Sequence, residues 1–534
     1  MDGCYNIFRF VSEALRPLLQ TKCPLGTESL CLLSAIFLIV SAIPALGEVT
    51  KSKEVKEGSR GGNCFERWQA ETPLDGKNGP RDDTDADGYA NLVEFAFGLT
   101  ADSGFQQGFD SLPRLVYNPQ TAKFDFEYRR RADLPGNLSI TLMLTGFQGY
   151  EERSSLVPAV TQTQDGFETV VYANLESDPV CQSQTQGKAR LLVCLSSEHG
   201  GTVDAQTPFW CWRRQILQAG GSRSFAMPLV RPEIYRGRVA AVTPSSLDIA
   251  HVLSAGEDFV SALDRAESYY VEVVDGDWEG QRWEVDEPAC SAGEIALDLT
   301  SQKNTHDTVP DLSGVIIAVR PHQTLSSVIR MDRLLAATQS SQADRVQFWE
   351  RAENRYTECW LSLREGNQRR WVSVGDSTHA DSGRRVVQPG EGMFVKLGSV
   401  SASVPLVGLV RDSDLILSIG KGTSFLGTGW TEAASPGQLD MKNRQGFCAG
   451  TRSPQADRLR VWNNQSKVAS TLSGYYLRAV TGAESQWVME GDTEMMDHND
   501  TSLLNGFEAF FLIHPGAFTQ WRQPAQLFQG MDFQ

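Results

Sequence analysis

The sequence has few of the features that mark a common enzyme class. It contains only seven histidines, and it lacks an H-E-x-x-H zinc motif, a G-x-S-x-G nucleophile turn, a phosphate-binding loop and a G-x-G-x-x-G fingerprint. His322, which follows a predicted buried strand, is the best single catalytic candidate. No base or nucleophile motif accompanies it, so a hydrogen-bonding role at a strand end is favoured.

Cysteines are few and scattered, and no C-x-x-C pair occurs, which argues against a zinc knuckle. Cys4, Cys23 and Cys31 lie in or before an apolar N-terminal run, which leaves an odd number for the rest of the chain. Such a set is not a disulfide framework. Cys181 and Cys194 flank a predicted β-hairpin and are the candidate pair for a disulfide.

Basic residues are outnumbered, with 49 Lys and Arg against 66 Asp and Glu and a net charge of -17. Nucleic acid and anionic lipid surfaces demand positive patches, so both are excluded as partners. An acidic surface suits a soluble exported protein in a salty or calcium-bearing medium. The 534 residues, with 41% hydrophobic content, are enough for about three or four domains of roughly 150 residues.

Long apolar runs are absent except at residues 30–45, and a charged stretch follows from Lys51. Pro44 and small residues close the run, which is typical of a signal peptide cleaved near residues 45–47. An uncleaved anchor is the alternative, because the run is nearly long enough to span a bilayer. After cleavage we expect no membrane span, and a secreted, periplasmic or outer-surface location.

Residues 83–94 match a calcium-loop template. Carboxylates stand at positions 1, 3 and 5, Gly88 at 6, a backbone carbonyl at 7, an amide at 9 and a bidentate carboxylate at 12. The predicted ligands are Asp83, Asp85, Asp87, Tyr89, Asn91 and Glu94. A hard cation takes roughly six to eight oxygens, and this spacing folds them around one centre, so the loop is predicted to bind Ca²⁺.

An acidic, solvated turn that caps a helix is the alternative interpretation of this loop. Asp87 would then lie near the N-terminus of a helix over residues 91–97, and Gly98 would be its C-cap. Upstream, residues 64–71 are predicted to form a short amphipathic helix with Phe65 and Trp68 on one face. Calcium is favoured, because the full ligand set rarely coincides with the glycine.

Beyond Gly98 the hydrophobic pattern changes to a period of two, which predicts antiparallel strands. We expect a mainly β, multi-domain chain of sandwiches or barrels after a short helix–calcium loop–helix element. Strands are predicted at 115–117, 123–128, 138–144, 167–172, 189–195, 237–242, 246–250, 269–274, 282–285 and 314–319. The predicted domains are a signal peptide (1–47), a linker (48–63), the calcium-loop sandwich (64–198), a linker (199–224) and two β domains (225–410 and 411–534).

An internal repeat links the last two predicted domains. Residues 336–345 align with 449–458 at an offset of 113, which becomes 116 after a short insertion. The matched pairs are Trp349/Trp462, Leu361/Leu477, Gly366/Gly482, Trp371/Trp487, Asp376/Asp492, Gly390/Gly506 and Phe394/Phe510. One β unit of about 100 residues therefore occurs twice.

The polar and aromatic residues of this repeat allow a functional interpretation. Asp344, Asp457, Asp376 and Asp492 could be paired catalytic carboxylates, but turn and cap aspartates are favoured. Its aromatic residues are expected to fill cores rather than stack on sugars. They are Trp349, Trp360, Trp371, Trp462, Tyr475, Tyr476 and Trp487.

Three patterns in residues 64–197 resemble a module of exported proteins from planctomycete–verrucomicrobial bacteria. They are F-x-x-W at 65–68, D-x-D-x-D-G-x-x-N-x-x-E-x-A-x-G-L at 83–99, and a strand ending in Y-R-R-R-A-D at 128–133. The loop itself is similar to thrombospondin type 3 and dockerin loops. The resemblance implies calcium ligation by Asp83, Asp85, Asp87, Asn91 and Glu94. Dockerin loops occur in pairs, and the single copy here argues against a cohesin-type partner.

Residues 225–521 resemble an uncharacterised family of exported proteins from the same bacterial group. The motifs that carry it are Y-V-E-V at 270–273 with Gly276, R-P-H at 320–322 with 324–325, A-D-R-V at 343–346, P-G-E-G at 389–392 and A-D-R-L at 456–459. The family has no assigned activity, so this resemblance implies only an exported location and a β architecture.

These observations predict a calcium-stabilised protein whose role is binding or structural rather than catalytic. A glycan or an envelope component is the expected class of partner, and the oligomeric state stays open. One alternative is an extracellular polysaccharide hydrolase, which needs two facing carboxylates. The other is an envelope assembly protein that uses the repeat pair as a rigid spacer.

Overall fold

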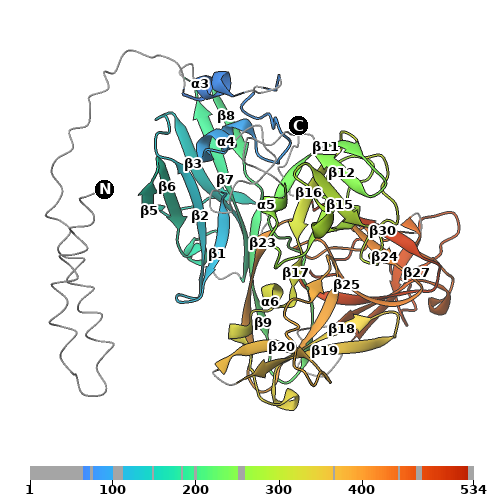
Figure 1. The fold of residues 1–534 in the computed structure, drawn as a ribbon. Coiled ribbons are helices and arrows are strands. Elements are labelled where there is room, and N and C mark those ends of the chain that lie inside the picture. Colours follow the sequence, from blue (N-terminus) through green and yellow to red (C-terminus); the bar gives the residue numbers. More distant parts are fainter. Residues whose placement is uncertain are drawn as a thin grey trace, which may run out of the picture. The chain divides into compact units, whose positions relative to one another are not determined.

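Antiparallel β-sheets make up most of the structure, a computed structural model (Figure 1). It describes residues 64–526 except 73–75, 78, 100–111, 147–149, 182–184, 198–200, 250–258, 365–366, 443–444, 463 and 465–471. The predicted signal peptide and first linker therefore lie outside the described residues, as does Gly366. The mainly β fold class is confirmed.

Two short helices precede the first sheets, as the sequence predicts. Helix α3 (Cys64–Glu71) places Phe65 and Trp68 in a stack with ring centroids 5.6 Å apart. Helix α4 (Asn91–Phe97) is completely buried and contacts β2, β7 and β8. It ends at Gly98, which has a left-handed backbone with φ of 69° and donates its N–H to the Glu94 carbonyl. The helix bounds and the Gly98 cap are therefore confirmed.

Two sheets enclose the first core. The first sheet has the order β1-β2-β6-β5, and the second has the order β23-β9-β7-β3-β4, with β8 also paired to β7. Their strands are β1 (Arg114–Asn118), β2 (Lys123–Arg131), β3 (Leu138–Thr145), β4 (Glu151–Arg153), β5 (Ala159–Gln164), β6 (Phe167–Tyr172), β7 (Gln186–Ser196), β8 (Thr202–Gln206), β9 (Trp210–Leu217) and β23 (Ala402–Leu409). Alternate residues of β1 and β2 are buried, which is the period-two pattern of the sequence.

The predicted linker at 199–224 is wrong, because it contains β8, β9 and the start of the next strand. Glycine and serine occur only near its two ends, and the aromatic residues between them face inward. Trp210 and Trp212 pack into the first core, while Cys211 and Leu217 on the other face of β9 pack into the following core. The β9–β23 pair thus serves two cores, so the first sandwich is not confined to residues 64–198.

A closed six-stranded barrel follows, with the order β11-β12-β15-β14-β13-β16. Its strands are β11 (Tyr235–Val242), β12 (Ser246–Ile249), β13 (Tyr269–Val273), β14 (Arg282–Val285), β15 (Glu294–Asp298) and β16 (Ile316–Pro321). Val239, Trp283, Ile295 and Val319 fill its interior. The predicted hairpin at 237–250 is confirmed as β11 and β12, and helix α5 (Phe259–Ala262) lies between β12 and β13 in the chain.

Two five-stranded sheets complete the fold and share one strand order. The upstream sheet is β10-β22-β18-β19-β20 and the downstream sheet is β25-β29-β26-β27-β28. The upstream strands are β10 (Ser222–Ala226), β18 (Arg345–Glu350), β19 (Arg355–Leu363), β20 (Arg369–Ser373) and β22 (Gly392–Lys396). The downstream strands are β25 (Gly422–Gly427), β26 (Arg458–Trp462), β27 (Leu472–Arg478), β28 (Gln486–Met489) and β29 (Ala509–His514).

Each of these sheets is accompanied by a two-stranded pairing. In the upstream case β9 pairs with β23, and in the downstream case β24 (Leu415–Ile419) pairs with β30 (Thr519–Gln523). The barrel is inserted in the chain between β10 and β18, followed by the short elements β17 (Gln323–Thr324) and α6 (Leu325–Val328). The short strand β21 (Val386–Val387) pairs with β17.

Strand register corrects one pair of the sequence alignment. Val346 pairs with Val395, and Leu459, its match at offset 113, pairs with Leu512. The neighbouring residue pairs place Phe394 and Phe511 at equivalent positions of the two sheets. The predicted match of Phe394 with Phe510 is therefore wrong by one residue. A shift of one residue moves a side chain to the other face of a strand.

Aromatic residues join the two sheets. Phe425 stacks on both Phe394 and Phe511, with ring centroids 4.5 Å apart in each pair. Trp349 and Trp462 pack against this cluster. Trp371 and Trp487 are fully buried in the two separate cores, as predicted. The aromatic residues of the two sheets therefore stabilise packing rather than form an open sugar-stacking face.

The seven cysteines that the structure describes are all free, so the predicted Cys181–Cys194 pairing is wrong. Cys181 is buried in the first core with Ala189, Leu191 and Val193. Cys194 follows Val193 on β7, and adjacent strand residues point to opposite faces. Within the described residues, no helix is long and apolar enough to cross a membrane.

Candidate metal centre

The acidic loop brings its first three carboxylates together. One oxygen each from Asp83, Asp85 and Asp87 lie within 4.8 Å of one another. Backbone N–H groups hold the loop in this shape, because Asp83 accepts from Asp87 N at 3.1 Å and from Gly88 N at 3.0 Å. Gly88 has a φ of 90°, a conformation that glycine adopts without strain. The local sequence therefore produces the predicted convergence.

Burial makes this cluster costly without a cation. Asp85 is 1% exposed and Asp87 3% exposed, and Asp85 Oδ2 finds no hydrogen-bond partner among the described residues. Burial, followed by the charge of Asp83, raises the pKa of Asp85 to about 7. Burial and the charges of Asp85 and Asp83 raise the pKa of Asp87 well above its usual range. An unpartnered buried carboxylate oxygen beside two others fits a hard divalent cation such as Ca²⁺.

The other three predicted ligands lie around this cluster in different roles. Tyr89 N donates to Asp87 Oδ1 at 2.7 Å. Asn91 donates its side-chain amide to the carbonyls of Lys77 and Gly79, and its Oδ1 accepts from a threonine hydroxyl, so Asn91 braces the loop. Glu94 is completely buried in the first turn of α4.

The helix-capping interpretation of Asp87 is wrong. The N-cap of α4 is Ala90, whose side chain makes no cap hydrogen bond. The first N–H groups of the helix instead donate to backbone carbonyls, with Asn91 N 2.8 Å from Asp82 O and Leu92 N 3.0 Å from Pro80 O. The Asp87 carboxylate accepts instead from Tyr89 N, which precedes the helix.

The loop packs against a buried ionic network at the barrel. A Cβ built on Gly88 would lie 3.4 Å from the side chain of Arg236, so the loop backbone touches this residue. Arg236 pairs with Asp412 at 2.7 Å and with Glu233 at 3.4 Å, and Arg320 pairs with Glu233 at 2.5 Å. The sequence gives no local signal for this network, because its members come from distant segments.

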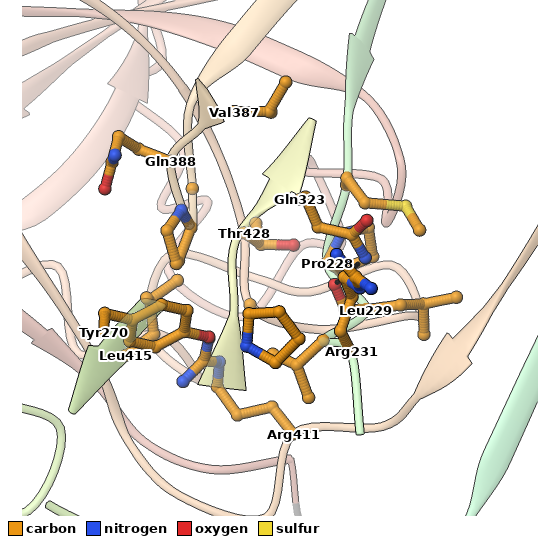
Figure 2. A pocket seen from close by; sticks show the side chains of 16 residues that line it. Pro228, Leu229, Arg231, Tyr270, Gln323, Val387, Gln388, Arg411, Leu415 and Thr428 are labelled. Carbon is orange, nitrogen blue, oxygen red and sulfur yellow. Dashed lines mark hydrogen bonds between the residues drawn. The ribbon is translucent and has the colours of Figure 1, made fainter. Parts of the chain in front are cut away.

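His322 belongs to the same end of the barrel rather than to an open cleft. Its Nε2 lies 3.0 Å from Glu284 Oε2, and its ring is 4.8 Å from that of Tyr270. Figure 2 shows Tyr270, Arg411 and Arg231 around the adjacent pocket. That pocket leaves room for about one water molecule, so it cannot admit a substrate.

A larger hollow lies beside the N-terminal helices. It has a volume of about 600 Å³ and is lined by Trp68, Leu99, Arg131, Asp133 and Phe167, among others. Asp133 accepts two hydrogen bonds from Arg131, each 2.9 Å long, and is mostly exposed. A hollow of this size with aromatic and charged walls can hold a polar ligand.

No family model matches the chain, and no curated protein matches it.

Proposed function

We propose that the protein is a secreted or cell-surface binding and structural protein that is stabilised by calcium. The observation that carries the proposal is the convergence of Asp83, Asp85 and Asp87, with a buried Asp85 oxygen that has no hydrogen-bond partner in the described part of the chain. Ca²⁺ at this place would neutralise carboxylates that burial and mutual repulsion disfavour. Export supplies a compartment with enough calcium, because extracellular sites bind at about 10⁻⁴ to 10⁻³ M.

The role of the ion in this proposal is to hold the loop against the barrel. Glu233 adds negative charge near Asp87, and Arg236 contacts the turn at Gly88. A cation in the loop would offset the repulsion between Glu233 and Asp87 and would leave the contact between Arg236 and Gly88 in place. The loop, the barrel and the chain around Asp412 would then be held by one electrostatic network.

The proposal includes an internal duplication and the two family resemblances. The shared strand order of the upstream and downstream sheets supports two copies of one unit, the first of which is interrupted by the barrel. The residues that resemble the exported bacterial module also line the hollow, since Trp68 and Asp133 come from its first and last patterns. These features support an envelope or surface role.

Thermal unfolding of the full chain with calcium and with chelator tests the metal site. At 10 mM calcium and a Kd of about 0.1 mM, the ion would stabilise the native state by about 2.7 kcal/mol. We expect a transition that rises with calcium in wild type and in Glu152→Ala, an exposed control on β4, but not in Asp87→Ala. An equal rise in Asp87→Ala, or no rise in wild type, would refute the site.

The same melt at two pH values sharpens the test. In chelator, the raised pKa of Asp85 means that protonation stabilises the native state, fully below the unfolded value of 3.8. This stability is lost as the pH rises through about 7. Chelated protein should therefore melt lower at pH 8 than at pH 5, calcium should stabilise more at pH 8, and Asp85→Asn should weaken both effects.

The hollow beside the N-terminal helices is the proposed site of ligand binding. Trp68 and Phe167 offer aromatic surface, and Asp133 offers a carboxylate to hydroxyl groups, which suits a glycan. A glycan array probed with the full chain should show ligands that Asp133→Ala binds at least about tenfold more weakly, equivalent to one lost charge-assisted hydrogen bond. Glu353→Ala, an exposed acidic control elsewhere, should bind as wild type. Binding that is equal in all three proteins would remove the hollow as the site.

A further inference from the structure

Three side chains from separate segments meet at the edge of the downstream core. They are Cys448, before β26, Asp457, immediately before the same strand, and His514, the last residue of β29. One ligand atom of each lies within 4.8 Å of the others. Asp457 is 0% and His514 2% exposed, whereas Cys448 is partly exposed. The cluster thus combines a sulfur, an oxygen and a nitrogen in a mostly buried position with one accessible side.

The contacts of His514 place its Nδ1 opposite a carboxylate oxygen. Its Nε2 lies 2.7 Å from the Ala517 carbonyl, which can only accept, so Nε2 carries a proton. Its Nδ1 lies 2.7 Å from Asp457 Oδ1. A neutral ring would then aim a lone pair at a carboxylate oxygen. Either a proton lies between the two atoms, or a metal ion beside them takes both as ligands.

The upstream sheet shows that this cluster is not needed to build the unit. Asp344, which aligns with Asp457, accepts from Leu335 N at 2.7 Å and from Gly398 N at 2.8 Å. Leu335 matches Cys448 at the offset of 113 and by its hydrogen bond to the aspartate. The strand register places Leu397 where the downstream sheet has His514.

The downstream sheet replaces one of these backbone donors with a side chain. Pro515 stands where the upstream sheet has Gly398, and proline has no N–H. Asp457 Oδ2 still accepts from Cys448 N, at 2.5 Å, but its Oδ1 now faces His514. The same strand order therefore forms with two leucines, and the two metal-ligand side chains are specific to the downstream copy.

Gly516 keeps the space beside the thiol open. A Cβ built on this glycine would lie 2.7 Å from Cys448 Sγ and 2.9 Å from His514 Nε2, closer than real side chains approach. The backbone at this position has no positive φ, so the close approach, rather than the conformation, accounts for the glycine.

We propose that Cys448, Asp457 and His514 bind a divalent transition metal ion, with Zn²⁺ the preferred one, through Sγ, a carboxylate oxygen and Nδ1. Zn²⁺ accepts this mixture of ligands, and three protein ligands leave a fourth tetrahedral position for water. The bond from His514 Nε2 to Ala517 O is the outer contact that fixes the ring tautomer of a metal-ligating histidine. On binding, the ion displaces the thiol proton and any proton at Nδ1.

A cysteine nucleophile activated by His514 fits the same residues less well. Both ring nitrogens of His514 face oxygen atoms, so neither is directed at the thiol as a base. Burial and the charge of Asp457 raise the pKa of the Cys448 thiol, which opposes formation of a free thiolate. A bound metal ion would reverse this effect, because a coordinating thiol is deprotonated.

Metal titration of the full chain, freed of metal by a chelator, tests the proposal. We expect Zn²⁺ to bind in competition with a chromophoric chelator, and Co²⁺ to give a thiolate-to-metal charge-transfer band. Cys448→Ser should abolish the band and weaken Zn²⁺ binding more than the roughly 10–100-fold that loss of an outer contact costs. Cys290→Ser, another partly exposed thiol, should keep both properties.

The outcomes separate cleanly and do not depend on the calcium loop. A Co²⁺ complex of wild type without the thiolate band, or Zn²⁺ binding that is unchanged in Cys448→Ser, would overturn the proposal. His514→Gln gives a second test, since it should weaken Zn²⁺ binding while the thiolate band of any residual Co²⁺ complex persists. Melting curves in chelator show whether each variant folds, and the wild-type Co²⁺ spectrum decides the question even if one does not.

Discussion

The upstream and downstream sheets have the same strand order, but the matched aspartate has different hydrogen-bond partners in the two sheets. In both, the aspartate precedes the central strand and accepts a hydrogen bond from the residue nine positions earlier, Leu335 or Cys448. The second acceptor oxygen binds the Gly398 backbone upstream and the His514 ring downstream. The comparison teaches that the aspartate anchors the strand in either way. Downstream, a histidine side chain replaces a backbone N–H as its partner, so the aspartate lies among side chains of the types that ligate metal ions.

The sheets also differ in what connects their first two strands along the chain. Upstream, β10 and β18 are separated by the whole barrel, whereas no strand lies between β25 and β26 in the described residues. In both sheets these strands are not neighbours, because β22 or β29 lies between them. The strand order therefore does not depend on a short connection, which is why a second folded body can stand there.

Substitution of each aspartate by alanine should give the largest difference in stability between the two sheets. Asp344→Ala leaves two partly buried N–H groups without their charged acceptor, at a cost of about 2–4 kcal/mol. Asp457→Ala leaves only one such N–H group, that of Cys448, without its acceptor. In chelator at pH 8, Asp457→Ala should therefore lower the free energy of unfolding by about 1–2 kcal/mol less than Asp344→Ala.

Thermal and denaturant unfolding of both variants measures this difference. Asp376→Ala and Asp492→Ala are the controls, because these matched aspartates accept backbone N–H groups in exposed turns. The controls should change stability less than either buried aspartate. Equal losses for Asp344→Ala and Asp457→Ala would show that the two anchors are equivalent, although Asp344 accepts from two backbone N–H groups and Asp457 from one.

The matched tryptophans should give a smaller difference. Trp487 Nε1 donates to Met441 O at 2.8 Å, whereas Trp371 Nε1 is buried without a hydrogen-bond partner in the described chain. Substitution by phenylalanine leaves a similar cavity in both sheets, but only Trp487→Phe loses a hydrogen bond. Trp487→Phe should therefore be about 1 kcal/mol more destabilising than Trp371→Phe, as measured by the shift of the unfolding midpoint. A reversed order would show that the two cores relax differently around the cavity.

Local patterns in the sequence predicted local structure well. Period-two alternation located β2, and the spacing of Asp83, Asp85 and Asp87 predicted carboxylates that do converge. These features depend on neighbours in the chain, so a sequence displays them directly. Gly98 as a helix terminus belongs to the same group, because its left-handed backbone follows from the local turn.

Features that depend on distant contacts were missed. The glycine- and serine-rich composition around β9 hid Trp210 and Trp212, which are strand residues because two cores flank them. Cys448 and His514 carry no mutual motif, since they meet only when β26 pairs with β29. The sequence repeat could have found Cys448, which it matches with Leu335. It matches His514 with Gly398 at the offset of 116, however, so only the strand register reveals the exchange of Leu397 for His514.

The shared β9–β23 pair has a consequence for how the chain must mature. The first sandwich begins near the N-terminus, yet one of its edge strands arrives only after the barrel and most of the upstream sheet. Until residue 409 has emerged from the ribosome, β9 exposes an unpaired edge and the face that carries Cys211 and Leu217. Such long-range pairing is slow and prone to aggregation. The N-terminal part of this protein therefore needs protection during synthesis, and a chain truncated before β23 should depend on chaperones even though its acidic loop at residues 83–94 is intact.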